Sequence, residues 1–241
     1  MYVITAMTND RIKAIMKLKQ KKNRQESRSF LVEGWHLVEE ALKANRCLMI
    51  VHTDHVPHFT GPTLHVAPDV FKKLSDVESI QGIMAVVSFP EEMPLTKRIL
   101  LLDGIQDPGN LGSLLRSARA FGFDSIVMEQ TVDVFNPKVI RATQGAIFGL
   151  HLFEDNLHDF MKQHPEYTYY GSTPHGGIDL SRIEHDSENI ALILGNEGSG
   201  IRAELLDATT ANLTIPIAHQ ESLNVAVAGG IFMHLLGGEH S

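Results

Sequence analysis

The chain has 241 residues, 43% of them hydrophobic and 21% charged, which is enough to bury one large or two small globular cores. Its single cysteine, Cys47, excludes an internal disulfide framework and favours a reducing compartment, so we expect a cytoplasmic protein. No run of residues is long and apolar enough to cross a membrane, and residues 1–10 lack the pattern of a secretory signal peptide.

The net charge of −8 argues against a nucleic-acid partner until the chain is divided. Residues 1–97 carry 13 basic and 11 acidic side chains, whereas residues 98–241 carry 8 and 18. The first 28 residues alone hold 8 basic and 2 acidic side chains. This asymmetry indicates a polyanionic partner for the N-terminal part, although a solvated basic helix face would give the same count.

The first predicted element is an amphipathic helix over residues 9–22, because apolar residues recur there at helical spacing. A basic loop is expected to follow it. Basic side chains in this arrangement suit contacts with nucleic-acid phosphates, which position a partner without reading its sequence. The side chains that we expect to make these contacts are Lys17, Lys21, Lys22, Arg24 and Arg28.

Strands and helices alternate in the rest of the N-terminal part, which predicts a small α/β domain. The expected strands cover 29–33, 47–52, 63–67 and 82–89, and the expected helices cover 34–45 and 68–74. Residues 90–96 are polar and twice interrupted by proline, which is typical of an inter-domain linker. We therefore predict two domains, residues 1–92 and 98–241.

Residues 98–122 predict a strand, a turn and a helix. The apolar run 99–102 is typical of a strand buried on both faces of a parallel sheet, and the turn formers of 103–109 end it. Asn110 is the expected N-cap of the helix, and Gly122 its stop. Turns at the carboxyl ends of parallel strands are where α/β proteins place their ligands.

The alternation continues to the end of the chain and predicts a parallel-sheet α/β domain. Strands are expected at 125–128, 151–153, 167–172, 190–194 and 211–215, and helices at 137–144, 156–163, 202–206 and 222–236. Ser222 is the expected N-cap of the last helix. Gly229 and Gly230 inside that helix predict either close packing against another backbone, as at a subunit interface, or a kinked or frayed helix.

Three motifs follow one another along the chain. They are Asn110–Gly112 with Arg116, then LILGNEGSG over 192–200, and then IPI over 215–217 with ESLNVAVA over 221–228. In this order they resemble the motifs of the SpoU/TrmH family of RNA 2′-O-ribose methyltransferases, which belong to the SPOUT class. FLVEG over 30–34 and Gln81-Gly82 resemble the ribosomal-protein-L30e-like substrate-binding domain of family members. Two positions depart from the pattern: Ile80 stands where the family often has proline, and His219 where it often has glycine.

The resemblance implies an S-adenosylmethionine-dependent enzyme, a homodimer, and a catalytic domain closed by a trefoil knot. Knotted chains are exceptions to the usual topology rules, and nothing in the composition predicts one. The catalytic residues that the resemblance implies are Arg116, Asn110, Glu197, Ser222 and Asn224. The cofactor-binding residues that it implies are Thr173, Leu194, Gly195, Asn196, Ile215, Ser222 and Leu223.

The residues themselves constrain the chemistry. Methyl transfer to a ribose needs an activated hydroxyl, an aligned donor and stabilisation of developing charge. The family assigns activation to the arginine at Arg116, but a guanidinium resists deprotonation and more easily orients the ribose, binds a phosphate or stabilises an alkoxide. The glycine-rich run 195–200 lacks the ending of a P-loop, and the 13 histidines show no zinc spacing, so no metal is implied.

These observations favour an RNA 2′-O-ribose methyltransferase. The appended L30e-like domain favours ribosomal RNA over transfer RNA as the substrate. A non-catalytic RNA-binding or ribosome-assembly factor with the same fold is one alternative, and a nucleotide-dependent doubly wound enzyme is another. Binding of S-adenosylmethionine without methyl transfer would support the first alternative, and binding of NAD or ATP would support the second.

Overall fold

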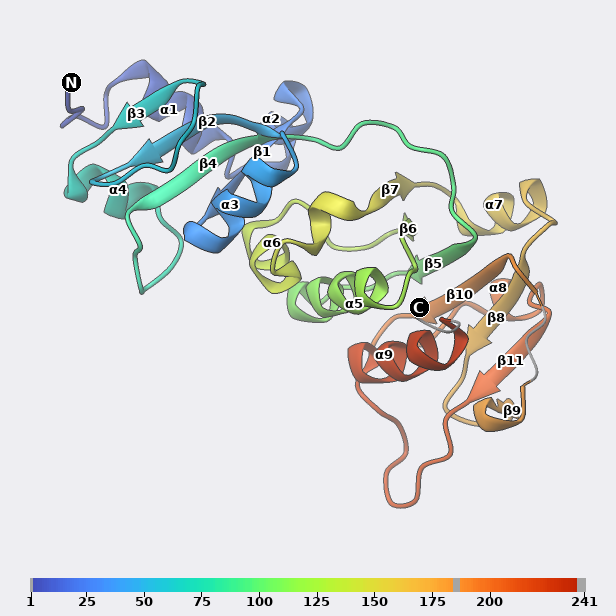
Figure 1. The fold of residues 1–241 in the computed structure, drawn as a ribbon. Coiled ribbons are helices and arrows are strands. Elements are labelled where there is room, and N and C mark those ends of the chain that lie inside the picture. Colours follow the sequence, from blue (N-terminus) through green and yellow to red (C-terminus); the bar gives the residue numbers. More distant parts are fainter. Residues whose placement is uncertain (1, 184–186, 238–241) are drawn as a thin grey trace. The chain divides into compact units, whose positions relative to one another are not determined.

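A computed structural model describes residues 2–183 and 187–237 (Figure 1). The chain divides into two compact units. Unit 1 comprises Met1–Glu91 and Asp133–Phe148, and unit 2 comprises Glu92–Val132 and Gly149–Ser241. The first change of unit falls within the predicted linker. The sixteen residues Asp133–Phe148, from the middle of the chain, are grouped with the N-terminal part, which the sequence did not indicate. The functional division into two domains stays a prediction.

Unit 1 contains a four-stranded mixed sheet. Its strands are β1 (Ser29–Glu33), β2 (Cys47–His52), β3 (Thr63–His65) and β4 (Ile83–Ser88), in the order β1-β4-β2-β3. Strand β4 runs antiparallel to β1 and β2, and β2 runs parallel to β3. The helices of the N-terminal part are α1 (Asp10–Lys17), α2 (Lys21–Ser27), α3 (Trp35–Lys43) and α4 (Pro68–Leu74). Ile12, Val66 and Phe71 lie in its core.

The predicted single helix over 9–22 is wrong, and so is the basic loop after it. Helix α1 ends at Lys17, and the supposed loop forms α2. Lys, Arg, Gln and Glu are good helix formers, so α2 forms without an apolar stripe, and its one buried residue is Arg24. Hydrophobic periodicity cannot detect such a helix.

Helix α6 (Pro137–Thr143) and the 3₁₀ turn η1 (Ala146–Gly149) follow the point where the chain returns to unit 1. The ring of Phe135 lies 3.9 Å from that of Phe89 and 4.9 Å from that of Phe30, measured between centroids. The guanidinium of Arg24 pairs with Asp133. Aromatic packing and a buried ion pair therefore fasten this returning segment to α2, β1 and the end of β4.

Unit 2 contains a seven-stranded sheet in the order β7-β6-β5-β10-β8-β11-β9, and every pairing in it is parallel. This confirms the predicted parallel-sheet domain. Its strands are β5 (Arg98–Asp103), β6 (Ser125–Glu129), β7 (His151–Glu154), β8 (Thr168–Ser172), β9 (Ile178–Asp179), β10 (Ile190–Gly195) and β11 (Ala211–Thr214). All six residues of β10 are buried, as its unbroken apolar run predicts.

The helices of unit 2 are α5 (Pro108–Ala120), α7 (Leu157–Gln163), α8 (Ala203–Leu206) and α9 (Val225–Leu236). Two predicted caps are wrong. Helix α5 is capped by Asp107, whose carboxylate accepts from the Asn110 amide, and α9 is capped by Asn224 in place of Ser222. In both cases an Asp or Asn two or three residues from the predicted cap takes its place. No helix in the described ranges could span a bilayer.

Helix α9 packs closely on α5 and β10. A Cβ on Gly229 would overlap the Leu114 side chain and would lie 2.7 Å from Cδ1 of Leu194. Gly230 has room, since the nearest atom to a Cβ there is Ser117 Oγ at 3.7 Å. The close-packing explanation of the glycine pair therefore applies to Gly229, and the neighbours that exclude a side chain belong to the same chain.

Candidate functional site

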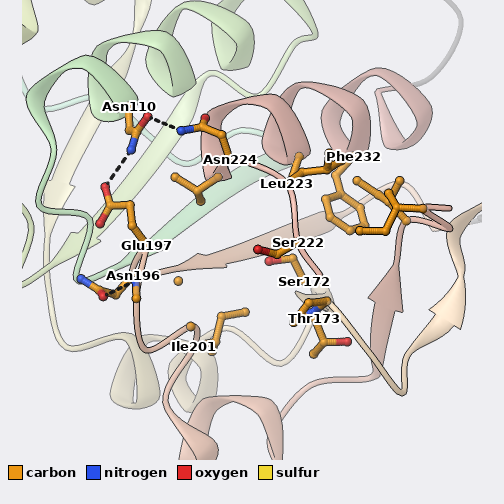
Figure 2. Close-up of a pocket in the computed structure, with 18 residues that line it drawn as sticks. Asn110, Ser172, Thr173, Asn196, Glu197, Ile201, Ser222, Leu223, Asn224 and Phe232 are labelled. Carbon is orange, nitrogen blue, oxygen red and sulfur yellow. Dashed lines mark hydrogen bonds between the residues drawn. The ribbon is translucent and has the colours of Figure 1, made fainter. Parts of the chain in front are cut away.

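A cavity of about 430 Å³ opens at the carboxyl ends of the central strands of unit 2 (Figure 2). Its walls are the turns after β8, β10 and β11, together with the first turn of α5 and one side of α9 as far as Phe232. Carboxyl-end turns of parallel strands are the usual ligand-binding position in α/β folds. Six of the seven predicted cofactor-binding residues line it, namely Thr173, Gly195, Asn196, Ile215, Ser222 and Leu223.

Leu194 is the exception among those seven. Its side chain is fully buried and lies against Gly229 of α9, so it packs the helix onto the sheet. Only a backbone contact with a ligand remains open to this residue. The turns after β8, β10 and β11 meet at this cavity. The knot itself stays a prediction.

The turn after β10 has a fixed shape. The backbones of Asn196 and Gly200 exchange hydrogen bonds of 3.0 and 3.1 Å, and Asn196 Oδ1 accepts from the Gly198 amide at 2.9 Å. Asn196 Nδ2 donates to the Gly104 carbonyl at 2.8 Å, which joins the turn to the end of β5. A Cβ on Gly195 would overlap the backbone of Gly200, so this turn requires glycine there.

A chain of hydrogen bonds links the three motifs across one side of the cavity (Figure 2). Asn224 Nδ2 donates to Asn110 Oδ1 at 3.0 Å, and Asn110 Nδ2 donates to Glu197 Oε1 at 3.1 Å. Asn224 Oδ1 also accepts from the Ala226 amide at 2.9 Å, where it caps α9. The motif residues Asn110, Glu197 and Asn224 are therefore brought together, one from each motif.

The Glu197 carboxylate is the centre of this arrangement. It accepts from the backbone amides of Gln106 at 3.2 Å and Asp107 at 3.1 Å, as well as from Asn110. Burial raises the pKa of Glu197, but these hydrogen bonds outweigh it, so that the pKa lies below the ordinary 4.5. The side chain is thus ionised at neutral pH and holds the start of α5 to the turn after β10.

Among the residues that the structure describes, the cavity walls carry one carboxylate, that of Glu197, and no Lys, Arg or His. An apolar side is formed by Ile201, Ile215, Ile217, Leu223 and Phe232. Such a lining suits a flat apolar group together with a cationic or neutral one, and does not suit phosphates. Within the described residues, no group of three or more His, Cys, Asp and Glu could hold a metal ion.

Arg116 is not brought to the cavity by its own chain. It lies on the exposed side of α5 and makes no hydrogen bond or ion pair with any described residue. It follows Asn110 by six positions, a rotation of roughly 240° about the helix axis, so the two side chains do not share a face. The remaining predicted catalytic residues, Asn110, Glu197, Ser222 and Asn224, all line the cavity.

Sequence reasoning missed Arg202, which holds the turn after β10 to the two neighbouring strands β5 and β6. Arg202 donates from its backbone and from Nε to the Asp103 carboxylate, at 2.9 and 2.8 Å, and its guanidinium also pairs with Glu129. These contacts fasten the far end of the Gly195–Ile201 turn to the ends of β5 and β6. The only signal in the sequence is a carboxylate closing each of two buried strands.

Of the predicted RNA contacts, Lys17, Lys21, Lys22 and Arg28 are exposed, as a phosphate contact requires. The predicted phosphate contact of Arg24 is wrong. Arg24 is 4% exposed, donates from Nη1 to the Leu18 carbonyl at 2.8 Å and pairs with Asp133. Because its charge is neutralised inside the fold, Arg24 holds α2 in place and is not available to a phosphate.

Comparisons with known proteins agree with this geometry. Residues 97–234 match the SpoU rRNA Methylase family, and residues 9–85 match the MRM3-like substrate binding domain. A 23S rRNA (guanosine(2553)-2′-O)-methyltransferase from Bacillus subtilis is 39% identical over 246 residues, covering 98% of this chain and 99% of that protein. An rRNA methyltransferase from Sinorhizobium meliloti, solved with AdoMet bound, has a TM-score of 0.86 at 29% identity, covering 97% of this chain and 96% of its own.

A third similarity concerns the fold alone. The SpoU methyltransferase AviRb from Streptomyces viridochromogenes has a TM-score of 0.84 at 22% identity, and the match covers 95% of this chain and 97% of that one. Both units of the chain lie within these full-length matches. The architecture described above is therefore shared from end to end, including the small N-terminal unit.

Proposed function

The chain belongs to the SpoU rRNA methylase family, and we propose that it transfers a methyl group from S-adenosylmethionine to a ribose 2′-hydroxyl of ribosomal RNA. The observation that carries the proposal is the convergence of all three motifs on the cavity of unit 2. The 23S rRNA methyltransferase of Bacillus subtilis, alike over almost the whole length of both chains, supports the same reaction. It also supports a site of action where ribosomes are assembled, in the cytoplasm.

The residues of the cavity fit S-adenosylmethionine. A volume of about 430 Å³ lies in the range of cofactor sites, the isoleucine-rich side suits an adenine ring, and a single carboxylate suits a cationic sulfonium or an ammonium group. The holding residues would be those of the turns after β8, β10 and β11, with Leu223 and Phe232 as apolar cover. When bound, the cofactor supplies a methyl group on a positively charged sulfur.

The hydrogen-bonded chain of Asn110, Glu197 and Asn224 keeps the cavity in one shape. Backbone amides also donate to the Glu197 carboxylate and to Asn224 Oδ1, so the site is organised before the substrate arrives. The Ser222 hydroxyl makes no hydrogen bond within the described residues and is free to orient a ribose. None of these groups is a strong base, since Glu197 has a lowered pKa.

Arg116 supplies the missing positive charge, and we propose that it does so from a second copy of the chain. The described residues that line the cavity of one chain include no cation, and Arg116 is not among them. In a homodimer the exposed side of one α5 could present its guanidinium to the cavity of the partner. There it would orient the ribose or stabilise the alkoxide that forms, because a guanidinium is a poor proton acceptor.

The test measures labelled methyl transfer from S-adenosylmethionine to RNA from a strain that lacks this gene. The RNA is separated into large ribosomal, small ribosomal and transfer fractions, and Arg116→Ala serves as the control. We expect label in large ribosomal RNA, resistant to alkali at one linkage. Label in transfer RNA would show that the substrate is transfer RNA and not ribosomal RNA. Cofactor binding with no methyl transfer would favour the non-catalytic factor.

A further inference from the structure

A second cavity, of about 320 Å³, lies in unit 1 at the start of α3. Its walls come from three separate stretches, residues 33–37, 77–81 and 141–144, all of which belong to unit 1. None of the exposed lysines of α1 and α2 lines it. A walled cavity is a more selective feature than an open basic surface, and nothing in the reaction described above uses it.

We propose that this cavity binds one unpaired nucleotide of the RNA substrate, with Arg141 on a phosphate and Gln81 and Gln144 on the base. The inference rests on the proposed function, because it takes RNA as the substrate. It adds a contact that reads a nucleotide, whereas the lysines of α1 and α2 can only attract a backbone.

Arg141 is the cation of the cavity. It is half-buried, and its guanidinium makes no hydrogen bond or ion pair with any described residue. By contrast, Arg24 and Arg202 are each paired with carboxylates. An arginine held at a cavity wall without an acidic partner offers its planar fork to a phosphate, which it can bind through two parallel hydrogen bonds.

The acidic residue of the cavity is already engaged. Glu33 accepts hydrogen bonds from the Ser75 hydroxyl and from the Asp76 amide, the latter at 3.3 Å. Its carboxylate is therefore held towards the segment that follows α4. No ion pair joins it to Arg141, so the charge of Arg141 is not neutralised within the cavity.

The two glutamines leave one donor and one acceptor for a ligand. Gln81 Oε1 accepts from the Trp35 amide at 2.8 Å, so its amide nitrogen is unpaired among the described residues. Gln144 Nε2 donates to the Arg141 carbonyl at 2.8 Å, which leaves its Oε1 unpaired. A donor and an acceptor at fixed positions are what a base edge requires.

The remaining walls support a base rather than a free phosphate. Leu37 and Val77 provide apolar surface, and the His36 ring is fixed by its hydrogen bond to the Gln144 carbonyl at 3.1 Å. Proteins that read RNA by sequence take unstacked bases from single-stranded regions into such mixed pockets. The proposal therefore selects an unpaired nucleotide in a loop or bulge of the RNA.

The experiment compares Arg141→Gln with Arg46→Gln. Both changes replace a half-buried arginine of unit 1, and Arg46 lies beyond the opposite end of α3. The probe is a 23S rRNA transcript centred on guanosine 2553, the nucleotide in the name of the Bacillus subtilis relative. We expect Arg141→Gln to weaken RNA binding about tenfold and to reduce the salt slope by about one. Arg46→Gln should change neither, and S-adenosylmethionine affinity should hold in both.

A second readout uses Trp35, the single tryptophan, which is the first residue of α3. RNA should change its fluorescence in the wild type and in Arg46→Gln. A wild-type transcript substituted with 4-thiouridine should cross-link to residues 77–81, which tests the cavity without any variant.

Three outcomes would overturn the inference. One is Arg141→Gln binding RNA as Arg46→Gln does, and another is cross-links confined to α1 and α2. The third is a wild-type protein that neither binds nor methylates RNA, which would remove the proposed function as well. An active wild type with an unaffected Arg141→Gln variant would remove only the nucleotide site.

Discussion

The two cavities of this chain have opposite chemistry. In the part of the chain that the structure describes, the cavity in unit 2 has one carboxylate, no cation and an apolar side rich in isoleucine. The cavity in unit 1 has an unpaired arginine, a histidine and two amides, and its one carboxylate is engaged elsewhere. The difference shows that a net charge of −8 says little about partners, because each ligand meets only the charges of its own site.

The same contrast appears in how the two sites are held. In unit 2 the cavity is supported by a network that includes Glu197, Arg202 and Asp103, and its groups satisfy one another. In unit 1 the polar groups of the cavity keep unused hydrogen-bonding capacity. A site for a small cofactor that every turnover needs benefits from preorganisation, whereas an RNA loop can complete its own site on binding.

The largest effect is expected at Arg116, because the described walls of the cavity in unit 2 carry no cation. Arg116→Ala should lower the transfer rate by about 100-fold or more, because stabilisation of developing charge is lost. S-adenosylmethionine affinity, measured by calorimetry, should stay within a few-fold, since Arg116 does not line the cavity. Mixing Arg116→Ala with Glu197→Ala chains should restore part of the activity if the site is shared between subunits. An active Arg116→Ala protein would exclude it from the mechanism.

The next effect concerns the basic surface of unit 1. Reversing the charge at Lys17, Lys21 and Lys22 should weaken RNA binding by about 10- to 100-fold and flatten its salt dependence by up to about three units of slope. These side chains are exposed, so stability should hardly change. Filter binding over a series of salt concentrations gives both numbers. A slope equal to that of the wild type would place the RNA elsewhere.

A packing change should separate the stability of unit 2 from its chemistry. Gly229→Ala introduces a methyl group against Leu114 and Leu194 and should cost about 1–3 kcal/mol of unfolding free energy. Gly230→Ala is the matched control, with room for the methyl group, and should gain up to about 1 kcal/mol. Denaturant titration of both variants tests the difference. Equal behaviour of the two would mean that α9 does not approach β10 so closely.

Glu197 tests whether the cavity of unit 2 depends on its carboxylate. Glu197→Ala should weaken S-adenosylmethionine binding about tenfold, because three donors lose their acceptor. Since its hydrogen bonds hold the pKa below 4.5, binding should be independent of this group from pH 6 to 8. The dependence should appear only as the pH falls through the lowered pKa. Calorimetry at several pH values measures this dependence. A titration of binding near neutrality would contradict the assignment.

The smallest effect lies in the core of unit 1. His52 is 2% exposed, and its ring stacks on His65 at 5.0 Å between centroids. Burial lowers the pKa of His52 below 6.5, the neighbouring His65 acts in the same direction, and Asp54 opposes both. The folded state therefore binds fewer protons, and stability should fall as the pH drops below about 6.5. His52→Phe should flatten that part of the profile, whereas an unchanged profile would assign the effect to other groups.

The parts of the fold that depend on local patterns were predictable. The apolar run of β10 predicts a strand buried on both faces, and the sheet is parallel at every pairing. The motif turns also predict the cavity, because carboxyl-end turns in one parallel sheet must meet at one edge. Caps were predicted less well, since Asp107 and Asn224 compete with Asn110 and Ser222 within three residues.

Features that depend on distant residues were not predictable. Arg24 looks like a phosphate ligand until Asp133, 109 residues away, is seen to neutralise it. Arg202 lies 99 residues from Asp103, and neither stands out locally. The cavity of unit 1 joins three stretches that share no motif, and the one residue that carries its charge, Arg141, lies in a part of the sequence assigned to the other domain.

The return of the chain to unit 1 at Asp133–Phe148 has a practical consequence for anyone who wishes to dissect this protein. A gene fragment that stops at residue 92 would encode Arg24 without its counter-ion and Phe30 without the ring of Phe135. Such a truncation should be poorly soluble. A protease nick in the exposed stretch 91–94 should instead leave two pieces that copurify, in the manner of a split reporter reassembled from complementary fragments.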